Sequence, residues 1–238
     1  ESGNIFYKKL TDIIIKNTNL VLVEGKIYKK YILESHNKKA YYFPNVVPID
    51  EIPLKVHKKF SSNRLKVIFV GFAYEGKGIK ELLNGANIFA NDGNLIELTL
   101  VGQVSLEIKN YILEFSLSKN FKLILKGKLK HEDVLNEFTK NDVYCYPTRH
   151  DGEGHNNTIN EALMHGLVVS STKLGFIGDF LNEKNSYPIN KLKDEEIAKI
   201  FLDIIEDVPL AIKKSMKGRN LILAEFNSQK AKSKLEIY

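Results

Sequence analysis

The sequence predicts an α/β protein whose larger part is a doubly wound parallel sheet with helices on both faces. From residue 65 onward, short apolar runs alternate with stretches of helical period, a pattern typical of parallel sheets covered by helices. A glycine-rich turn follows the first apolar run, and a polar loop follows the fourth. Hydrophobic residues make up 43% and charged residues 27% of the 238 residues, which is enough apolar content for one large core.

The first 64 residues predict a smaller unit and a connection. Residues 5–16 and 26–35 have helical periodicity, and residues 20–23 and 41–43 predict short strands. Residues 47–64 contain two prolines, mixed charges and a Ser-Ser-Asn cluster with little periodicity. We therefore expect a linker over residues 47–64.

The larger part carries six predicted strands and six predicted helices in alternation, which together indicate a Rossmann-like domain. The strands are expected at residues 66–70, 95–101, 121–125, 142–146, 167–171 and 186–189. The helices are expected near residues 78–90, 105–117, 131–139, 158–165, 175–181 and 194–205.

Residues 147–169 form the most informative stretch, because two glutamates flank a polar loop and a helix start. Glu153 lies on the loop after a predicted strand, and Glu161 lies in the first turns of the helix. Free backbone N–H groups at a helix start favour an anion, while carboxylates accept hydrogen bonds from hydroxyls. The arrangement therefore suits a ligand that contains both a phosphate and a polyol, as a nucleotide sugar does. Alternatively, Thr158 and Glu161 form a capping box, and Glu153 is a solvated loop carboxylate.

The turn after the first strand of the domain, GFAYEGKGIKELL, is the second informative stretch. Gly71 lets the chain leave the strand tightly, and Lys77 lies beside a predicted helix start where phosphate binds readily. The spacing satisfies a phosphate-loop pattern until Gly78, which occupies the Ser/Thr position needed for magnesium. A nucleotide triphosphatase is therefore disfavoured.

Composition narrows the partners and the compartment. The net charge of +6 and an isoelectric point near 9.1 suit anionic phosphates, and they leave peripheral contact with a membrane surface open. The lysines are scattered without interleaved aromatics, so we expect no nucleic acid. Cys145 is the single cysteine, which favours a reduced compartment and hence the cytoplasm. His150, His155 and His165 lack a compact ligand spacing, so no metal site is predicted.

The stretch EGHNNTINEALMHGLVVSS resembles the EGxPNxxxEAMAxGxPVVAS signature of the family 4 glycosyltransferases, which are retaining enzymes with the two-domain GT-B fold. The signature's glutamate pair falls on Glu153 and Glu161. The turn VGFAYEGKG is similar to the family's VGR-x4-KG, so Lys77 matches the lysine that holds the donor diphosphate. Phe72 stands where the family usually has arginine.

The resemblance implies a site and its ligands. The donor is a nucleoside diphosphate sugar and the acceptor is a hydroxyl of a glycan or lipid-linked molecule, with no cofactor and no metal. Glu153 and Lys77 are the implied catalytic residues. The implied substrate-binding residues are Gly154, His155, Asn156, Asn157, Thr158, Glu161, Gly71 and Gly127. Phe176 replaces a glycine of the family, and we expect it to narrow the site or to serve in packing.

The resemblance also implies a domain organisation. Residues 1–46 resemble the tail end of an acceptor-side N-terminal domain, 47–64 a linker, 65–226 the donor-binding domain and 227–238 a helix that crosses back. A fuller N-terminal domain or a partner subunit would then complete the enzyme, with capsule, lipopolysaccharide or other surface glycan synthesis at the inner membrane face as the implied setting. The alternatives are a donor-binding module without turnover of its own and, with less support, a sugar-nucleotide epimerase of the same fold.

Overall fold

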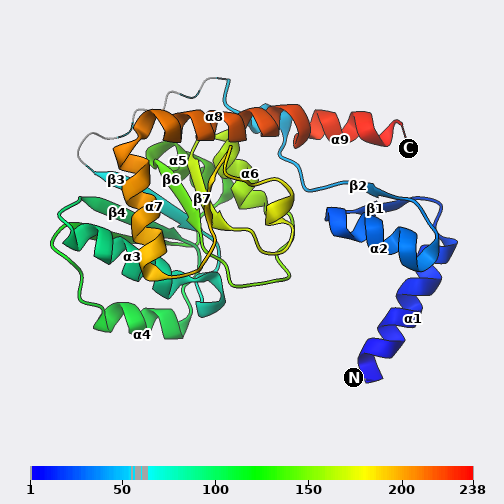
Figure 1. The fold of residues 1–238 in the computed structure, drawn as a ribbon, viewed down its shortest axis with the longest axis horizontal. Coiled ribbons are helices and arrows are strands. Elements are labelled where there is room, and N and C mark those ends of the chain that lie inside the picture. The colour runs from blue at the N-terminus through cyan, green and yellow to red at the C-terminus, as the bar shows by residue number, and fades with distance from the viewer. Residues whose placement is uncertain (1, 55, 57–59, 61–63, 238) are drawn as a thin grey trace.

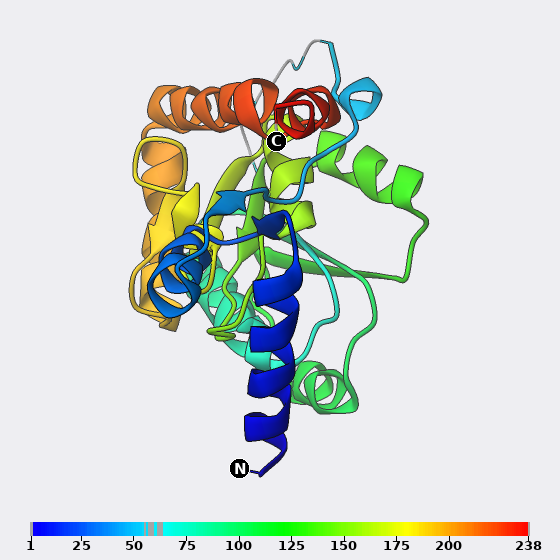
Figure 2. The same cartoon turned by 90° about the vertical axis from the view of Figure 1, so that its right-hand side faces the viewer.

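The computed structural model describes residues 2–54, 56, 60 and 64–237, and the side chains from residue 7 onward within that range. It has a smaller N-terminal unit and a larger α/β unit, which lie side by side in Figure 1, while in Figure 2 the smaller unit is in front of the larger one. The smaller unit pairs β1 (Val21–Val23) with β2 (Ala40–Tyr42) in parallel and adds α1 (Ser2–Asn17) and α2 (Lys26–His36). These elements follow the predicted ranges closely.

The larger unit is built on a six-stranded parallel sheet with the order β5-β4-β3-β6-β7-β8. The strands are β3 (Leu65–Val70), β4 (Ile96–Val101), β5 (Phe121–Gly127), β6 (Val143–Tyr146), β7 (Val168–Thr172) and β8 (Tyr187–Ile189). The order reverses between β3 and β6, which places a crevice at their carboxyl ends. The predicted α/β class with a parallel sheet is confirmed.

Helices cover both faces of this sheet, with α3 and α7 on one face and α5 and α6 on the other, and α8 runs along one edge of the molecule (Figures 1 and 2). They are α3 (Ile79–Asn91), α4 (Leu106–Glu114), α5 (His131–Lys140), α6 (Asn157–Met164), α7 (Asp194–Glu206), α8 (Val208–Glu225) and α9 (Ser228–Leu235). Every residue of β6 and β7 is buried, because helices cover both faces of these central strands.

The structure differs from the predicted elements at two places. The helix expected over residues 175–181 is a single 3-10 turn, Ile177–Asp179, which follows Gly175 in a left-handed conformation at φ 57°. The long helix α8 has no counterpart among the predicted elements. Its sequence has a weak apolar stripe, but Asp207 caps it by accepting a hydrogen bond from the Leu210 N–H at 2.9 Å.

The two units meet along a seam formed by the start of α2 and the turn after β7. The Asp179 carboxylate accepts a hydrogen bond from the Lys26 N–H at 2.8 Å, which satisfies a free donor at the start of α2. The ring of Phe176 packs edge-on against Tyr28, with centroids 5.2 Å apart. A Cβ on Gly25 would lie 2.2 Å from this ring, so only glycine fits there. Phe176 therefore serves in packing between the units.

The smaller unit keeps much apolar surface exposed. Tyr7, Ile13 and Ile14 of α1 are 68%, 59% and 56% exposed, and Leu22 of β1 is 38% exposed. Its small core contains Ile15, Ile32 and Ala40. The larger unit instead has one extended core.

The contact between α3 and α7 generates a stability prediction. A Cβ on Gly85 would lie 2.7 Å from Ile197 and 2.8 Å from the Asp194 carbonyl oxygen. We expect Gly85→Val to lower the free energy of unfolding by about 2 kcal/mol, because overpacking forces the two helices apart. Urea unfolding measures this change. Asn91→Val, which adds the same side chain at an exposed position of α3, should change the free energy by under about 0.5 kcal/mol. Equal effects of the two substitutions would contradict the prediction.

Candidate functional site

Two loops meet at the carboxyl ends of β3 and β6, because these strands pair in parallel. One loop leads from β3 to α3 and the other from β6 to α6, and the Arg149 N–H donates to the Gly76 carbonyl at 2.9 Å to join them. Gly78 has φ 66°, and a Cβ there would lie 2.0 Å from the Pro147 carbonyl oxygen. The loops approach this closely only because residue 78 is glycine.

This approach brings together the two predicted catalytic residues. The Lys77 ammonium forms an ion pair and a hydrogen bond with Oε1 of Glu153. The side chains of Lys77 and Glu153 are only 16% and 8% exposed. Burial lowers the pKa of Lys77, because removal from water disfavours the charged amine.

Glu153 is held from several directions, so the alternative of a solvated loop carboxylate is wrong. Its Oε1 also accepts hydrogen bonds from the Tyr146 hydroxyl and the Thr148 hydroxyl, both at 3.1 Å. The Glu153 carbonyl accepts a hydrogen bond from the Phe176 N–H at 2.9 Å. The turn after β7 therefore positions the backbone of the Glu153 loop, while β6 positions its carboxylate.

The start of α6 differs from the capping box considered from sequence. The cap is Asn156, whose Oδ1 accepts from the Ile159 N–H at 3.1 Å. Thr158 is the second residue of the helix, and its hydroxyl forms a hydrogen bond with the Tyr144 hydroxyl at 2.6 Å. Glu161 is thus too far along the helix to close a capping box, and that alternative is wrong. Asn157 is exposed at the first helical position.

His155 contributes its peptide group to the site, while its ring is enclosed. The ring lies 4.2 Å from the ring centroid of Phe180 and 4.9 Å from that of Phe226, and the residue is 1% exposed. Burial lowers the pKa of His155 to about 4, so the ring is neutral at pH 7. Its N–H donates to Glu24 and its carbonyl accepts from Asn45 at 2.8 Å.

A crevice of about 330 Å³ opens in front of these groups. It brings together six of the residues predicted from sequence to bind substrate with one predicted catalytic residue, and both units contribute to it. Its lining is Glu24, Asn45, Val70, Gly71, Phe72, Lys77, Tyr146, Gly154, His155, Asn156, Asn157 and Thr158. Glu153 lies behind this wall, in contact with Lys77.

A second hollow of about 460 Å³ lies beside the first, and Phe72 lines both. It is formed by the loops after β4 and β5 and is lined by Gly127, whereas Gly71 lines the first hollow. The backbone connects these turns, because the Gly71 N–H donates to Val101 at 2.9 Å and the Gly102 N–H to Gly127 at 2.8 Å. Together the two hollows form an elongated cleft along the carboxyl edge of the sheet.

Glu161 lines neither hollow, and it lies near the start of α5. Its Oε1 is 4.0 Å from Nδ1 of His131, and His131 also bonds Glu51 at 3.1 Å. Burial raises the pKa of Glu161 to about 7, although His131 acts in the opposite direction. A carboxyl with this pKa is a hydrogen-bond donor as well as an acceptor near neutral pH.

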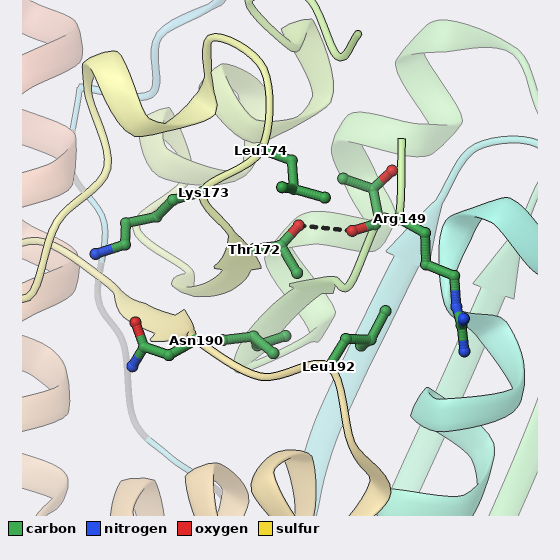
Figure 3. A pocket seen from close by; sticks show the side chains of 8 residues that line it. Arg149, Thr172, Lys173, Leu174, Asn190 and Leu192 are labelled. Carbon is green, nitrogen blue, oxygen red and sulfur yellow. Dashed lines mark hydrogen bonds between the residues drawn. The ribbon is translucent and has the colours of Figure 1, made fainter. Parts of the chain in front are cut away.

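A third cavity of about 390 Å³ lies at the ends of β6, β7 and β8, apart from the predicted site residues (Figure 3). Its charged side chains, Arg149 and Lys173, extend in different directions in Figure 3. Each is already paired, Arg149 with Glu81 and Lys173 with Glu183. This cavity offers no converging charges to a ligand.

Across residues 2–54, 56, 60 and 64–237, no helix has the length and apolarity needed to cross a membrane. Within the same residues, no three side chains of the metal-ligating types gather at one point.

The site combines a parallel sheet, a reversal of strand order and a lysine two residues before the start of α3, as in proteins that bind nucleotides and phosphate esters. Residues 64–207 match the family described as "Glycosyl transferases group 1". The chain belongs to this family.

Similar proteins agree with this assignment. The capsular polysaccharide biosynthesis glycosyltransferase CapM of Staphylococcus aureus is 27% identical over 179 residues, which are 74% of this chain and 45% of CapM. A solved glycosyltransferase from Rickettsia africae superposes with TM-score 0.77 at 18% identity, covering 98% of this chain and 66% of that one. HepE of Anabaena, solved with UDP-glucose, gives TM-score 0.72 at 15% identity, covering 97% and 67%.

These solved structures show the fold, which is the GT-B type of α/β architecture expected from the resemblance. The chain spans about half the length of the curated relatives it matches, at 45% and 59%.

Two polar residues of the crevice, Glu24 and Asn45, were not among the predicted site residues. Each follows one of the two strands of the smaller unit, with Glu24 directly after β1. A polar residue at the carboxyl end of a parallel strand is the signal that could have found Glu24. The tertiary contact with His155 has no sequence signal, because 131 residues separate the two.

Glu161 generates a prediction of pH dependence. Its pKa is about 7 in the folded protein against an ordinary 4.5. The folded state therefore binds this proton more tightly, so the stability it contributes is complete below about pH 4.5 and is lost as the pH rises through about 7. Glutamine does not titrate, so we expect Glu161→Gln to remove this loss. The free energy of unfolding of the variant relative to that of the wild type should therefore rise by roughly 2 kcal/mol between about pH 5 and about pH 8.

Urea unfolding of both proteins at the two pH values measures the difference. Glu114→Gln, at an exposed position of α4, is the matched control and should follow the wild type at both. A Glu161→Gln advantage that is the same at both pH values would show that Glu161 does not titrate in this range.

Proposed function

We propose that this chain is the donor-binding part of a retaining family 4 glycosyltransferase, which moves a sugar from a nucleoside diphosphate sugar to a hydroxyl acceptor. The observation that carries the proposal is the Lys77–Glu153 pair at the wall of a crevice lined by backbone of the 154–158 loop. A cation, backbone donors and a carboxylate acceptor in one place suit phosphate joined to a polyol.

Lys77 would neutralise the diphosphate as it binds and as it leaves. Charge on the departing diphosphate increases in the transition state, so a cation fixed beside it stabilises that state more than the ground state. The arrival of phosphate would give Lys77 a second anionic partner and leave Glu153 able to accept from sugar hydroxyls. Tyr146 and Thr148 would hold Glu153 in place during this exchange.

The two hollows suggest how an elongated donor would lie. The base would occupy the hollow with Gly127, the diphosphate would pass Phe72 to Lys77, and the sugar would face the end of the crevice with Glu24 and Asn45. Glu161, near the start of α5, would accept hydrogen bonds from the ribose hydroxyls. We propose this placement on the order of the residues along the edge of the sheet.

The acceptor side is proposed from the resemblance and the relatives. We propose a glycan or lipid-linked hydroxyl acceptor, held mainly by an N-terminal domain or partner subunit to which residues 1–46 belong. The linker of residues 47–64, the donor domain of residues 65–226 and the crossing segment of residues 227–238 complete the organisation. Surface glycan synthesis on the cytoplasmic side of the membrane is the proposed setting, in line with the name of CapM.

Phe72 favours a second candidate, a donor-binding module without independent turnover. Its ring is 52% exposed and lines both hollows, where the resembled family carries arginine. The diphosphate would therefore meet one cation fewer, and a charged hydrogen bond of about 1.5–3 kcal/mol would be missing. Turnover of the donor separates the two candidates.

Nucleotide binding tests the site. Titration calorimetry with UDP, GDP and ADP should show selective binding of one of the three. We expect Lys77→Gln to weaken that binding by about tenfold or more, since one charged contact with phosphate is lost. Glu161→Ala should weaken it by about threefold to tenfold through the ribose hydroxyls.

Glutamine at position 77 keeps a hydrogen-bond donor for buried Glu153, which alanine would leave uncompensated. Lys119→Gln, at an exposed loop position, is the matched control and should bind as the wild type does. Unchanged affinity in folded Lys77→Gln protein would contradict the proposed diphosphate site.

The Phe72 position gives a separate prediction. We expect Phe72→Arg to tighten UDP binding by about tenfold, because a guanidinium returns a bidentate phosphate partner. Phe72→Gln supplies hydrogen-bonding capacity without charge and should tighten binding by less than about twofold. UDP release from UDP-glucose, measured in wild type and in Phe72→Arg, favours the transferase if the wild type turns over and the module if only the arginine variant does. No tightening in Phe72→Arg would show that residue 72 does not face the diphosphate.

A further inference from the structure

Glu24 is a carboxylate that the smaller unit places inside the crevice of the larger one. It is the first residue after β1 and lines the crevice together with Lys77. Its Oε1 accepts hydrogen bonds from the His155 N–H and from Nδ2 of Asn45, the latter at 3.0 Å. One carboxylate oxygen is therefore fixed by two donors from different parts of the chain.

The loop opposite Glu24 fits it closely. A Cβ on Gly154 would lie 2.9 Å from Oε1 and 3.3 Å from Oε2 of Glu24. Any side chain at position 154 would consequently push the carboxylate away, whereas glycine lets it rest against the peptide backbone. The position of Glu24 is thus determined by sterics as well as by hydrogen bonds.

Glu24 is a charged residue of the crevice lining whose charge is not balanced by an ion pair among the described residues. Lys77 is already paired with Glu153, and none of the ion pairs among the described residues includes Glu24. The nearby ammonium of Lys26 donates instead to the Asp179 carbonyl at 2.7 Å. A ligand group that enters beside Glu24 therefore meets a net negative, partly buried wall.

We propose that Glu24 is a specificity-determining residue that selects neutral, hydroxyl-bearing sugars and rejects sugars that carry a carboxylate. This inference rests on the proposed function and concerns the end of the crevice beyond Lys77. Oε1 has two donors, and Oε2 accepts no hydrogen bond from the described residues, so it can accept one from a sugar hydroxyl. A sugar carboxylate at the same place faces a like charge and has no hydrogen to donate.

The substitution Glu24→Gln tests the charge with little change of geometry. The Oε1 atom of glutamine can still accept from both His155 and Asn45, so the loop keeps its partners. Titration calorimetry with UDP, UDP-glucose and UDP-glucuronate gives the affinities without requiring turnover. The wild type should bind UDP-glucose at least about tenfold more tightly than UDP-glucuronate, and Glu24→Gln should reduce this ratio by about tenfold with UDP affinity unchanged.

Asp179→Asn is the matched control, because it removes a carboxylate of the same seam that caps α2 outside the crevice lining. It should leave the ratio of affinities as in the wild type, and thermal unfolding verifies that all variants fold. A ratio near one in the wild type, or a ratio that Glu24→Gln leaves unchanged while UDP still binds, overturns the assignment of Glu24 alone. Absence of binding of UDP and of both UDP sugars to the wild type overturns this inference, and absence of GDP and ADP binding as well overturns the proposed function.

Discussion

The ion pair between Lys77 and Glu153 is the interaction on which the site depends. Two loops from neighbouring strands must touch for it to form, and the glycine at position 78 makes that contact sterically possible. Once formed, the pair lets each loop keep a charged group with little exposure to water. The pair therefore joins the two loops and also leaves two groups that a ligand can engage. Lys77 can exchange Glu153 for an anion of the ligand, and Glu153 can exchange Lys77 for a hydroxyl.

Most of the sheet could be predicted from sequence, because its strands are short apolar runs that end at glycine, proline or polar residues. The 143–146 and 168–172 strands are buried on both faces, and their uniform apolar or small residues are what such burial requires. The sequence pattern does not predict helix α8, because the apolar residues of this segment do not form a clear stripe. The sequence predicts a helix where the Ile177–Asp179 turn lies, because apolar spacing cannot show that Gly175 is left-handed.

The candidate site was predicted in part. Lys77, Gly71 and the loop from Gly154 to Thr158 share one crevice, since loops after adjacent parallel strands converge at one edge. Gly127 falls in a neighbouring hollow, and the ring of His155 turns into an aromatic cluster that periodicity does not reveal. Glu24 follows a predicted strand, so its place at a strand end could be expected, but its contact with His155 could not, because that contact depends on how the smaller unit docks on the larger one.

The uneven distribution of apolar surface affects the behaviour of the protein in solution. The six-stranded unit has one extended core and exposes Leu106 and Leu113 of α4, whereas α1 and β1 of the smaller unit expose Tyr7, Ile13, Ile14 and Leu22 beside a much smaller core. Exposed apolar side chains and short open strands favour contacts between molecules. We therefore expect the exposed side chains of α1 and β1 to contribute to concentration-dependent association, and detergent or a covering polypeptide to suppress the contacts that they make.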